Sequence, residues 1–242
     1  MQNKQPVFKR ILLKFSGEAL MGQKEFGIDS EILQYISDEI ATVVKLGVEV
    51  AIVIGGGNFF RGADLFKNGV DRITGDYMGI LATVINALAM RDIFDKNNLP
   101  SIVMSAIPMN GIAVPFDRNR AISYLQKGRI VILAGGTGNP LVTTDSAMSL
   151  RGVELKADIL LKATNVDGVY SSDPSKNPSA KLYKHLTYKE ALAKELAVMD
   201  LSAFCQCRDH NMRLRIFNMR KFGALFNIVT GEDEGTLVET GE

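Results

Sequence analysis

Two glycine-rich loops could bring backbone N–H groups close to a phosphate. The first, Gly55-Gly56-Gly57, follows an apolar run, and Arg61 could add a guanidinium group to the same anion. The second, residues 135–140, leads through Thr143-Thr144 to Asp145, so hydroxyls, an amide and N–H groups precede a predicted helix. One such loop could equally be a tight turn, whereas two loops at one edge of a sheet favour a site for two phosphate groups or two nucleotides.

Lys14 interrupts the apolar run of residues 11–15. A lysine within a buried strand is costly unless its ammonium group meets an anion at the end of the strand, although it could also extend into solvent as an edge lysine. Ser16-Gly17 follow it directly. We therefore expect Lys14 to stabilise phosphoryl transfer, a reaction that needs cations, N–H donors and in-line placement of two oxygens.

Other kinds of site fit the sequence less well. The chain has no Gly-Lys dipeptide and so no P-loop motif, and Phe60 and Leu141 stand where a dinucleotide-binding motif needs its third glycine. Cys205, Cys207 and His210 could suggest zinc, but on a predicted helix the two cysteines point about 200° apart. We therefore expect them to be ordinary helix residues.

The elements that must position these loops alternate between short apolar strands and helices. Strands are predicted over residues 11–15, 48–54, 101–105, 130–133, 159–161 and 214–217, with a closing strand over 226–229. Helices are predicted from a cap at Asp29 or Ser30 to Val44, and over 73–94, 118–127, 144–155, 188–196 and 201–211. Continuously apolar strands are covered on both faces, so we expect a largely parallel sheet with ligands at the carboxyl ends of its strands.

The composition bounds the class of protein. With 242 residues and 46% hydrophobic content the chain can fill one large α/β domain or two small lobes. Its formal net charge of +1 gives no field that would draw it to nucleic acid or an anionic membrane. Residues 1–10 are polar and charged, so we expect neither a signal peptide nor a membrane span. Two cysteines fit a reducing compartment, and we expect a cytoplasmic enzyme.

Further motifs accompany the glycine loops over nearly the whole chain. They are Lys14-Phe15-Ser16-Gly17-Glu18-Ala19-Leu20, Ile54-Gly55-Gly56-Gly57-Asn58, Arg61-Gly62, Gly75-Asp76, Thr137-Gly138-Asn139-Pro140, Thr143-Thr144-Asp145, Lys162 to Tyr170, and Met199-Asp200-Leu201. In this order and spacing they resemble the amino-acid kinase superfamily and, within it, the bacterial UMP kinases. The resemblance implies a three-layer α/β/α sandwich with a largely parallel central sheet. It also implies one domain over 1–242, with an acceptor-side lobe over about 1–140 and an ATP-side lobe over about 141–242.

The same resemblance implies a reaction and a set of site residues. ATP would phosphorylate UMP to UDP, with Mg²⁺ bound to the nucleotide, in a homohexamer. The implied catalytic residues are Lys14, Arg61 and Asp145, the last of which would orient Lys14 or the metal. The implied ATP-binding residues are Lys14, Phe15, Ser16, Gly17, Gly57, Arg61, Thr164, Asn165, Tyr170 and Asp173. The implied UMP-binding residues are Gly56, Asp76, Thr137, Gly138, Asn139, Pro140, Leu141, Val142, Thr143 and Thr144, with Asp76 at the ribose hydroxyls.

Regulation is implied as well. UTP would inhibit at the UMP site, and a segment linked to activation by GTP would comprise Gly22, Gln23, Lys24, Glu25, Phe26 and Gly27, with Arg91 and Arg129 as further candidates. Phe15, Leu141 and Val142 differ in shape from the residues expected there, which concerns packing around the loops rather than the reaction.

Two alternatives stay open. A kinase of the same superfamily acting on carbamate, acetylglutamate or aspartate would share Lys14 and the glycine loops, but would have no reason to keep Asp76 together with Thr137-Gly138-Asn139. A non-catalytic uridine-nucleotide sensor could keep the fold but would be free to lose the charges of Lys14, Arg61 and Asp145, so their presence argues against it.

Overall fold

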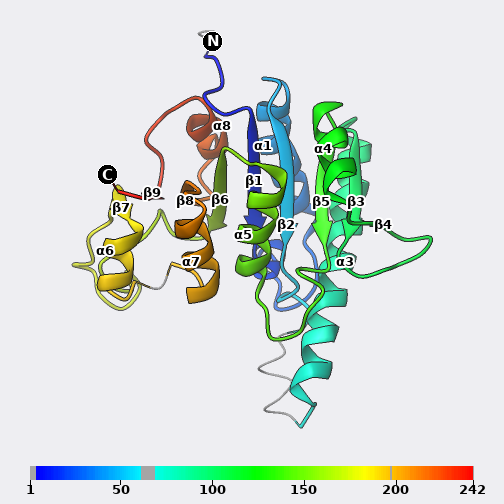
Figure 1. Cartoon of the computed structure of the whole chain (residues 1–242), viewed down its shortest axis with the longest axis horizontal. Coiled ribbons are helices and arrows are strands. Elements are labelled where there is room, and N and C mark those ends of the chain that lie inside the picture. The colour runs from blue at the N-terminus through cyan, green and yellow to red at the C-terminus, as the bar shows by residue number, and fades with distance from the viewer. Residues whose placement is uncertain (1–3, 61–68, 197, 242) are drawn as a thin grey trace.

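A single sheet runs through the whole molecule (Figure 1). The computed structural model describes residues 4–60, 69–196 and 198–241. Within these ranges nine strands pair in the order β4-β3-β5-β2-β1-β6-β8-β9-β7. All paired neighbours are parallel except β8 and β9, which are antiparallel. The predicted largely parallel sheet is confirmed.

The central strands are buried on both faces. They are β1 (Arg10–Phe15), β2 (Glu49–Ile54), β3 (Ser101–Ser105), β5 (Ile130–Ala134), β6 (Ile159–Thr164) and β8 (Leu214–Asn218). Successive side chains of a strand point to opposite faces, so Ile11, Leu13 and Phe15 enter one core and Leu12 enters the other. By the same alternation Lys14 lies on the Leu12 side. A charged side chain thus emerges on one particular face near the carboxyl end of β1.

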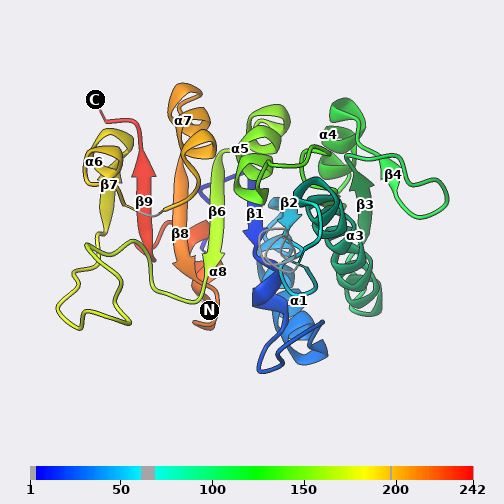
Figure 2. The same cartoon turned by 90° about the horizontal axis from the view of Figure 1, so that it is seen from below.

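Helices cover both faces (Figure 2). On one face lie α1 (Ser30–Val44), α3 (Arg72–Lys96) and α8 (Ala224–Val229), and on the other lie α4 (Arg118–Gln126), α5 (Thr144–Leu155), α6 (Tyr188–Ala193) and α7 (Leu201–Asp209). The three-layer α/β/α sandwich is therefore confirmed. Its two apolar cores, one on each side of the sheet, hold the carboxyl ends of the central strands in a fixed arrangement.

The closing strand predicted over 226–229 is wrong, because these residues belong to helix α8. A run of four apolar residues carries no periodicity that separates a strand from a buried helix turn. The chain turns into α8 at Gly223, whose φ of 77° is left-handed, and the Gly223 N–H donates to Glu39 Oε1 at 2.9 Å. The sequence also gave no prediction for the short elements η1 (Gly17–Leu20), β4 (Val114–Pro115), β7 (His185–Thr187) and β9 (Thr236–Glu239).

The long helix α3 extends beyond the carboxyl edge of the sheet (Figure 1). By length and composition alone it could cross a membrane, but its inner face packs into the core through Val84, Ala87, Met90 and Phe94. That is the behaviour of a core helix. Its outer face carries an apolar row at four-residue spacing, made of Ile73, Tyr77, Leu81 and Ile85, which are 37%, 46%, 45% and 47% exposed. We call these four residues the α3 stripe.

Candidate active site

A carboxylate held between two lysines lies near the carboxyl edge of the sheet. Parallel pairing of β1 with β6 sets Lys14 opposite Lys162, and Asp145 reaches both from the first turn of α5. Asp145 Oδ1 lies 2.8 Å from Lys14 Nζ, and its Oδ2 lies 2.6 Å from Lys162 Nζ. The side chains of Lys14, Asp145 and Lys162 are only 9%, 13% and 15% exposed. This cluster has a net charge of +1 and is largely shielded from water.

The charges in the cluster stabilise one another. Burial raises the pKa of Asp145, but the neighbouring ammonium groups of Lys14 and Lys162 outweigh burial and hold that pKa below its usual range. Burial lowers the pKa of Lys162, and the Asp145 carboxylate opposes this effect without fully cancelling it. Lys162 also donates to the carbonyl of Val198 at 2.6 Å. Asp145 therefore stays ionised at neutral pH and keeps two partly buried cations in place.

The amino terminus of α5 is fixed by hydrogen bonds from two elements. Thr143 is the N-cap, and its Oγ1 accepts from the N–H groups of Asp145 at 3.1 Å and Ser146 at 3.2 Å. The same hydroxyl donates to Asp200, the N-cap of α7, which also accepts from Ser146 Oγ at 3.1 Å and Ser202 Oγ at 2.6 Å. Burial raises the pKa of Asp200, but these hydrogen bonds lower it further than burial raises it. Asp145 thus lies at a helix end that is held in place by hydrogen bonds to Asp200 at the start of α7.

The glycine loop after β2 packs against the loop after β1. A Cβ on Gly17 would lie 2.4 Å from the Gly57 backbone nitrogen, and a Cβ on Gly56 would lie 2.3 Å from the Gly79 carbonyl oxygen of α3. Neither position accepts a larger residue without a backbone shift. Ser16 caps η1 and accepts from the Ala19 N–H at 3.2 Å. These close approaches bring three of the predicted ATP-contacting residues, Ser16, Gly17 and Gly57, into one place.

One cavity, which we call the acceptor cavity, opens between the two glycine-rich loops and α3. It has a volume of about 150 Å³, and the predicted UMP-binding residues that line it are Gly56, Asp76, Thr137, Asn139, Val142 and Thr144. Asp76 accepts from the Leu141 N–H at 2.9 Å and pairs with Arg72 at 3.1 Å. Leu141 holds a left-handed φ of 64° and is 64% exposed, so its backbone rather than its side chain serves this site.

A second cavity, the donor cavity, lies beyond β6. It has a volume of about 550 Å³, and its lining includes Lys162 together with the predicted ATP-binding residues Thr164, Tyr170 and Asp173. Asp173 accepts from Ser175 Oγ at 2.7 Å, which orders the loop at the rim. Lys162 lines the donor cavity, whereas Thr144, the neighbour of Asp145, lines the acceptor cavity. The cluster is therefore linked to the donor cavity through Lys162 and to the acceptor cavity through the chain neighbour of Asp145.

Several predicted residues lie elsewhere. The Phe15 side chain is fully buried and, with Asn165, Gly22 and Gln23, lines a cavity of about 340 Å³ under α1. The predicted catalytic residue Arg61 lies outside the described residues.

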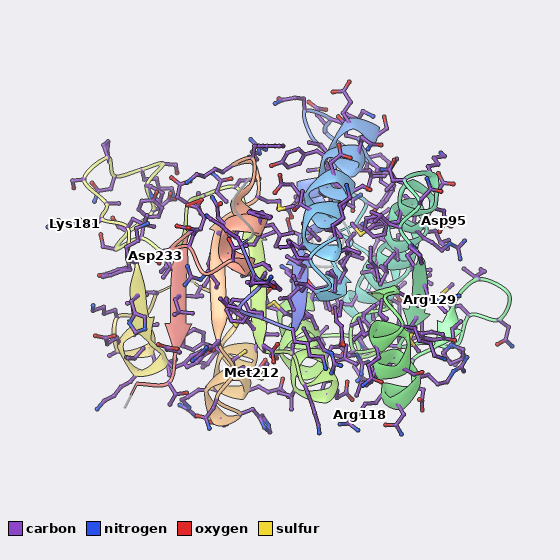
Figure 3. The ribbon with its side chains drawn as sticks, turned by 90° about the horizontal axis from the view of Figure 1, so that it is seen from above. Asp95, Arg118, Arg129, Lys181, Met212 and Asp233 are labelled. Atoms are coloured by element: carbon purple, nitrogen blue, oxygen red, sulfur yellow. The ribbon has the colours of Figure 1, made fainter. Side chains whose placement is uncertain are left out.

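The two arginines that the sequence suggested for GTP are also placed. Arg91 lines a cavity of about 390 Å³ beside β3. Arg129 precedes β5 and so lies at the amino edge of the sheet, with its guanidinium carbon 5.8 Å from the centre of the Tyr124 ring (Figure 3). Arg129 is therefore on the far edge from the Lys14 cluster.

Lys162 was quoted in a motif without a role, and the structure places it beside Asp145. The signal was present, because residues 159–162 repeat the Ile-Leu-Leu-Lys of residues 11–14. The argument that a lysine within an apolar strand needs an anion applies to both, yet the strand was predicted to end at Leu161, three residues before its end at Thr164, and so left Lys162 out. Asp200 was quoted in a motif without a role, and its N-cap position before α7 was the available signal.

The described residues contain no group of three or more His, Cys, Asp or Glu side chains that could hold a metal ion. Burial raises the pKa of the Cys207 thiol to about 12, so that this residue is an unreactive part of the core. Both oxygens of Asp145 face lysines. This donor set suits a divalent cation that arrives bound to phosphate oxygens better than one ligated by the protein alone.

Comparisons with known proteins agree with the fold. Residues 9–218 match the model of the amino acid kinase family. The chain is 63% identical over 238 residues to the uridylate kinase of Coxiella burnetii, covering 98% of each chain. It is 58% identical over 238 residues to the uridylate kinase of Pseudomonas aeruginosa strain PAO1, covering 98% of this chain and 97% of the relative.

Solved structures give the same result. The UMP kinase of Bacillus anthracis superposes with a TM-score of 0.94 at 42% identity, covering 97% of both chains. The UMP kinase of Ureaplasma parvum superposes with a TM-score of 0.90 at 34% identity, covering 99% of this chain and 100% of that one.

Proposed function

Since the chain belongs to the amino acid kinase family, we propose that it transfers the terminal phosphoryl group of ATP to UMP, forming ADP and UDP. The observation that carries this proposal is the Lys14–Asp145–Lys162 cluster, in which Lys162 lines one cavity and Asp145 directly follows Thr144, which lines the other. One cavity would hold the acceptor nucleotide and the other the donor. The transferred group would then pass beside two ammonium groups.

The reaction needs charge stabilisation more than proton transfer. A phosphate monoester has its second pKa at about 6, so the UMP phosphate is mostly a dianion at neutral pH. It therefore needs no general base to remove a proton before it attacks. One of its oxygens attacks the γ-phosphorus, the bond from that phosphorus to the β–γ bridging oxygen breaks, and ADP leaves with the electron pair. Lys14 and Lys162 stabilise the charge on the transferred group, and Asp145 positions the two lysines.

The acceptor side would recognise a nucleotide through backbone and short polar groups. Gly56 lines the acceptor cavity together with Thr137, Asn139, Val142 and Thr144, and Asp76 could accept from a ribose hydroxyl. On the donor side, Ser16, Gly17 and Gly57 would meet the ATP phosphates. Thr164, Tyr170 and Asp173 would line the space for adenine and ribose. We also propose an acceptor-side lobe over about 1–140 and an ATP-side lobe over about 141–242, with Ser16, Gly17 and Gly57 reaching the ATP phosphates from the acceptor-side lobe.

Mg²⁺ would arrive with ATP. When bound, it would neutralise charge on the phosphate oxygens that also face Lys14 and Lys162. Both carboxylate oxygens of Asp145 are paired with lysines, so the chain would contribute two positioned ammonium groups rather than a set of metal ligands.

The first test is ADP release with ATP and Mg²⁺, comparing UMP, CMP, dUMP, carbamate, N-acetylglutamate and aspartate at equal concentration. Turnover with UMP far above the other acceptors supports the proposal. Turnover with carbamate or an amino acid alone would overturn the acceptor. Binding of UMP or UTP without turnover of any acceptor would replace the kinase with a uridine-nucleotide sensor.

We further propose that the protein is a homohexamer in which the α3 stripe contacts a second copy. Four exposed apolar side chains at i, i+4, i+8 and i+12 form the ridge by which two helices commonly pack. Leu81→Glu should reduce the assembly size measured by light scattering. Ile112→Glu is the control, because Ile112 is equally exposed, at 45%, but lies off the stripe. An unchanged assembly in Leu81→Glu would refute the contact.

Regulation and location complete the proposal. UTP would inhibit by occupying the acceptor cavity, so its inhibition should be competitive with UMP. GTP would activate through the segment Gly22–Gly27, and a rate unchanged by GTP would remove that role. We propose a soluble, cytoplasmic protein with no nucleic-acid or membrane partner, since the formal net charge is +1 and α3, the long apolar helix among the described residues, packs into the core.

A further inference from the structure

Two buried asparagines form a closed amide pair beneath the first glycine loop. Asn58 follows the loop and is 2% exposed, whereas Asn86 lies on α3 and is fully buried, at 0%. Asn58 Nδ2 donates to Asn86 Oδ1 at 2.9 Å, and Asn86 Nδ2 donates to Asn58 Oδ1 at 2.7 Å. The two side chains therefore bond to each other in both directions across the gap between the loop and the helix.

The remaining amide hydrogens hold two backbone segments. Asn86 Nδ2 also donates to the Gly55 carbonyl at 2.7 Å, and Asn58 Nδ2 also donates to the Gly27 carbonyl at 3.0 Å. The Gly27 N–H in turn donates to the Asn58 carbonyl at 3.0 Å. All four amide hydrogens of the pair are thus used, which is the condition under which a buried polar pair is tolerated.

The pair fixes both ends of the glycine loop. Gly55 begins the loop and Asn58 ends it, so only Gly56 and Gly57 lie between the two anchored points. The fit around them is tight, since a Cβ on Gly56 would lie 2.3 Å from the Gly79 carbonyl and one on Gly17 would lie 2.4 Å from the Gly57 nitrogen. Both Gly56 and Gly57 line the acceptor cavity. A small shift at either anchor would move their N–H groups relative to a phosphate.

The chemistry of the pair suits a fixed anchor. Amides do not titrate, so these bonds hold at every pH at which the Lys14 cluster is charged. The anchor on α3 also lies one turn from Thr83, which lines the acceptor cavity and accepts from the Gly135 N–H at 2.8 Å. One helix face therefore sets the position of both glycine-rich loops relative to each other.

We propose that Asn58 and Asn86 are positioning residues for phosphoryl transfer, and that their amide pair holds the Gly56 and Gly57 N–H groups in the geometry that the reaction needs. This inference rests on the proposed kinase activity. Asn86→Ala removes the bonds to Asn58 and Gly55. Because a displacement of about 1 Å can cost about 100-fold in rate, we expect kcat to fall by about 10- to 100-fold. KM for UMP and ATP should change by less than about threefold, since the contacts to base and ribose are untouched.

Asn86→Asp gives a readout that loss of stability alone would not. At neutral pH the introduced carboxylate would face the Asn58 Oδ1 and Gly55 carbonyl oxygens, which are acceptors like itself. When protonated it could donate to one of them. The kcat of Asn86→Asp relative to that of the unaltered protein should therefore rise as pH is lowered from about 8 to about 5.5, whereas the relative kcat of Asn86→Ala should stay flat.

Ser37→Ala is the matched control. Ser37 is fully buried on α1 and accepts from Asn97 Nδ2 at 2.8 Å, so its loss also removes a partly buried hydrogen bond from an asparagine, near the far end of α3. This variant should lower Tm and leave kcat unchanged. Should Asn86→Ala fail to fold, Asn58→Ala, which leaves the Asn86–Gly55 bond in place, is measured by the same criteria.

Retention of kcat within twofold in Asn86→Ala, or in Asn58→Ala as its replacement, would overturn the proposal. The proposal would also be overturned if Ser37→Ala and Asn86→Ala lowered Tm equally and lowered kcat equally. If the unaltered protein does not phosphorylate UMP, the proposed function fails by itself, and hydrogen exchange of amides 55–60 then tests the pair. Exchange at least about tenfold faster in Asn86→Ala than in Ser37→Ala supports the anchor, and equal exchange refutes it.

Discussion

The substitution Asp145→Asn perturbs the centre of the proposed reaction with almost no change in side-chain size. It removes the one negative charge that lies 2.8 Å from Lys14 Nζ and 2.6 Å from Lys162 Nζ. An amide oxygen can still accept one hydrogen bond, but its NH₂ group would face the other ammonium. Two partly buried cations would then repel each other without compensation.

The size of the effect follows from burial. Breaking a fully buried ion pair costs about 3–5 kcal/mol. The three side chains here keep 9–15% exposure, and one hydrogen bond survives, so we expect a loss of about 2–3 kcal/mol in the free energy of unfolding. That is about 30- to 150-fold in the unfolding equilibrium and about 5–10 °C in Tm for a domain of this size. Because the lysines that would face the phosphoryl group lose their fixed positions, kcat should fall by about 100- to 1,000-fold.

The assay compares Asp145→Asn with Glu49→Gln. Glu49 pairs with Arg10 at 2.5 Å, both side chains are 10% exposed, and the pair lies at the amino edge of the same sheet. Glu49→Gln should lower Tm to a similar extent and leave kcat unchanged. ATP supplies the missing negative charge, so it should raise the Tm of Asp145→Asn by more than it raises that of the unaltered protein.

Near-normal kcat in Asp145→Asn would refute the positioning role of the carboxylate. A loss of kcat in Glu49→Gln as large as that in Asp145→Asn would show that activity follows stability alone. A smaller Tm increase with ATP than in the unaltered protein would show that the two lysines do not face the phosphates.

Three further outcomes are expected. Lys162→Met removes one cation and leaves Asp145 paired with Lys14 alone, so kcat should fall by about 100-fold, and a loss below threefold, measured by ADP release, would contradict its role. Thr143→Val removes the N-cap of α5 and the hydrogen bond to Asp200, so the free energy of unfolding in urea should fall by about 1–2 kcal/mol and KM for UMP should rise. An unchanged unfolding midpoint would contradict this. The folded-state pKa of Asp145 lies below its unfolded value of about 3.9, so its stabilising contribution is present above about pH 4 and is lost as pH falls through the folded pKa. In urea unfolding across this pH range, the free energy of unfolding should fall more steeply with acid for the unaltered protein than for Asp145→Asn. Parallel curves would refute the linkage.

Local patterns in the sequence were enough to predict the layered architecture. Continuously apolar strands separated by helices require cover on both faces, which leads to a parallel sheet with its loops at one edge. Glycine loops and Lys14 at the ends of such strands are local signals, and the structure brings them together at that edge. Helix α5 was predicted with the bounds that it has, since its N-cap and periodicity are both local.

Other features depended on long-range pairing, which no local pattern contains. The neighbourhood of Lys14 and Lys162 exists only because β1 pairs with β6, across nearly 150 residues of chain, in a register that aligns them. Asp145 and Asp200 meet the site from separate helices whose packing fixes their distance. The Asn58–Asn86 pair likewise joins a loop to a helix.

Residues 226–229 show a limit of secondary-structure prediction from local sequence, because an apolar run of four is compatible with either a strand or a helix. It becomes helical where Glu39 of α1 receives the Gly223 N–H. The sequence therefore supplied the residue types that phosphoryl transfer needs, and the tertiary structure decided which of them meet, since side-chain distances are set by strand order, register and helix packing rather than by spacing along the chain.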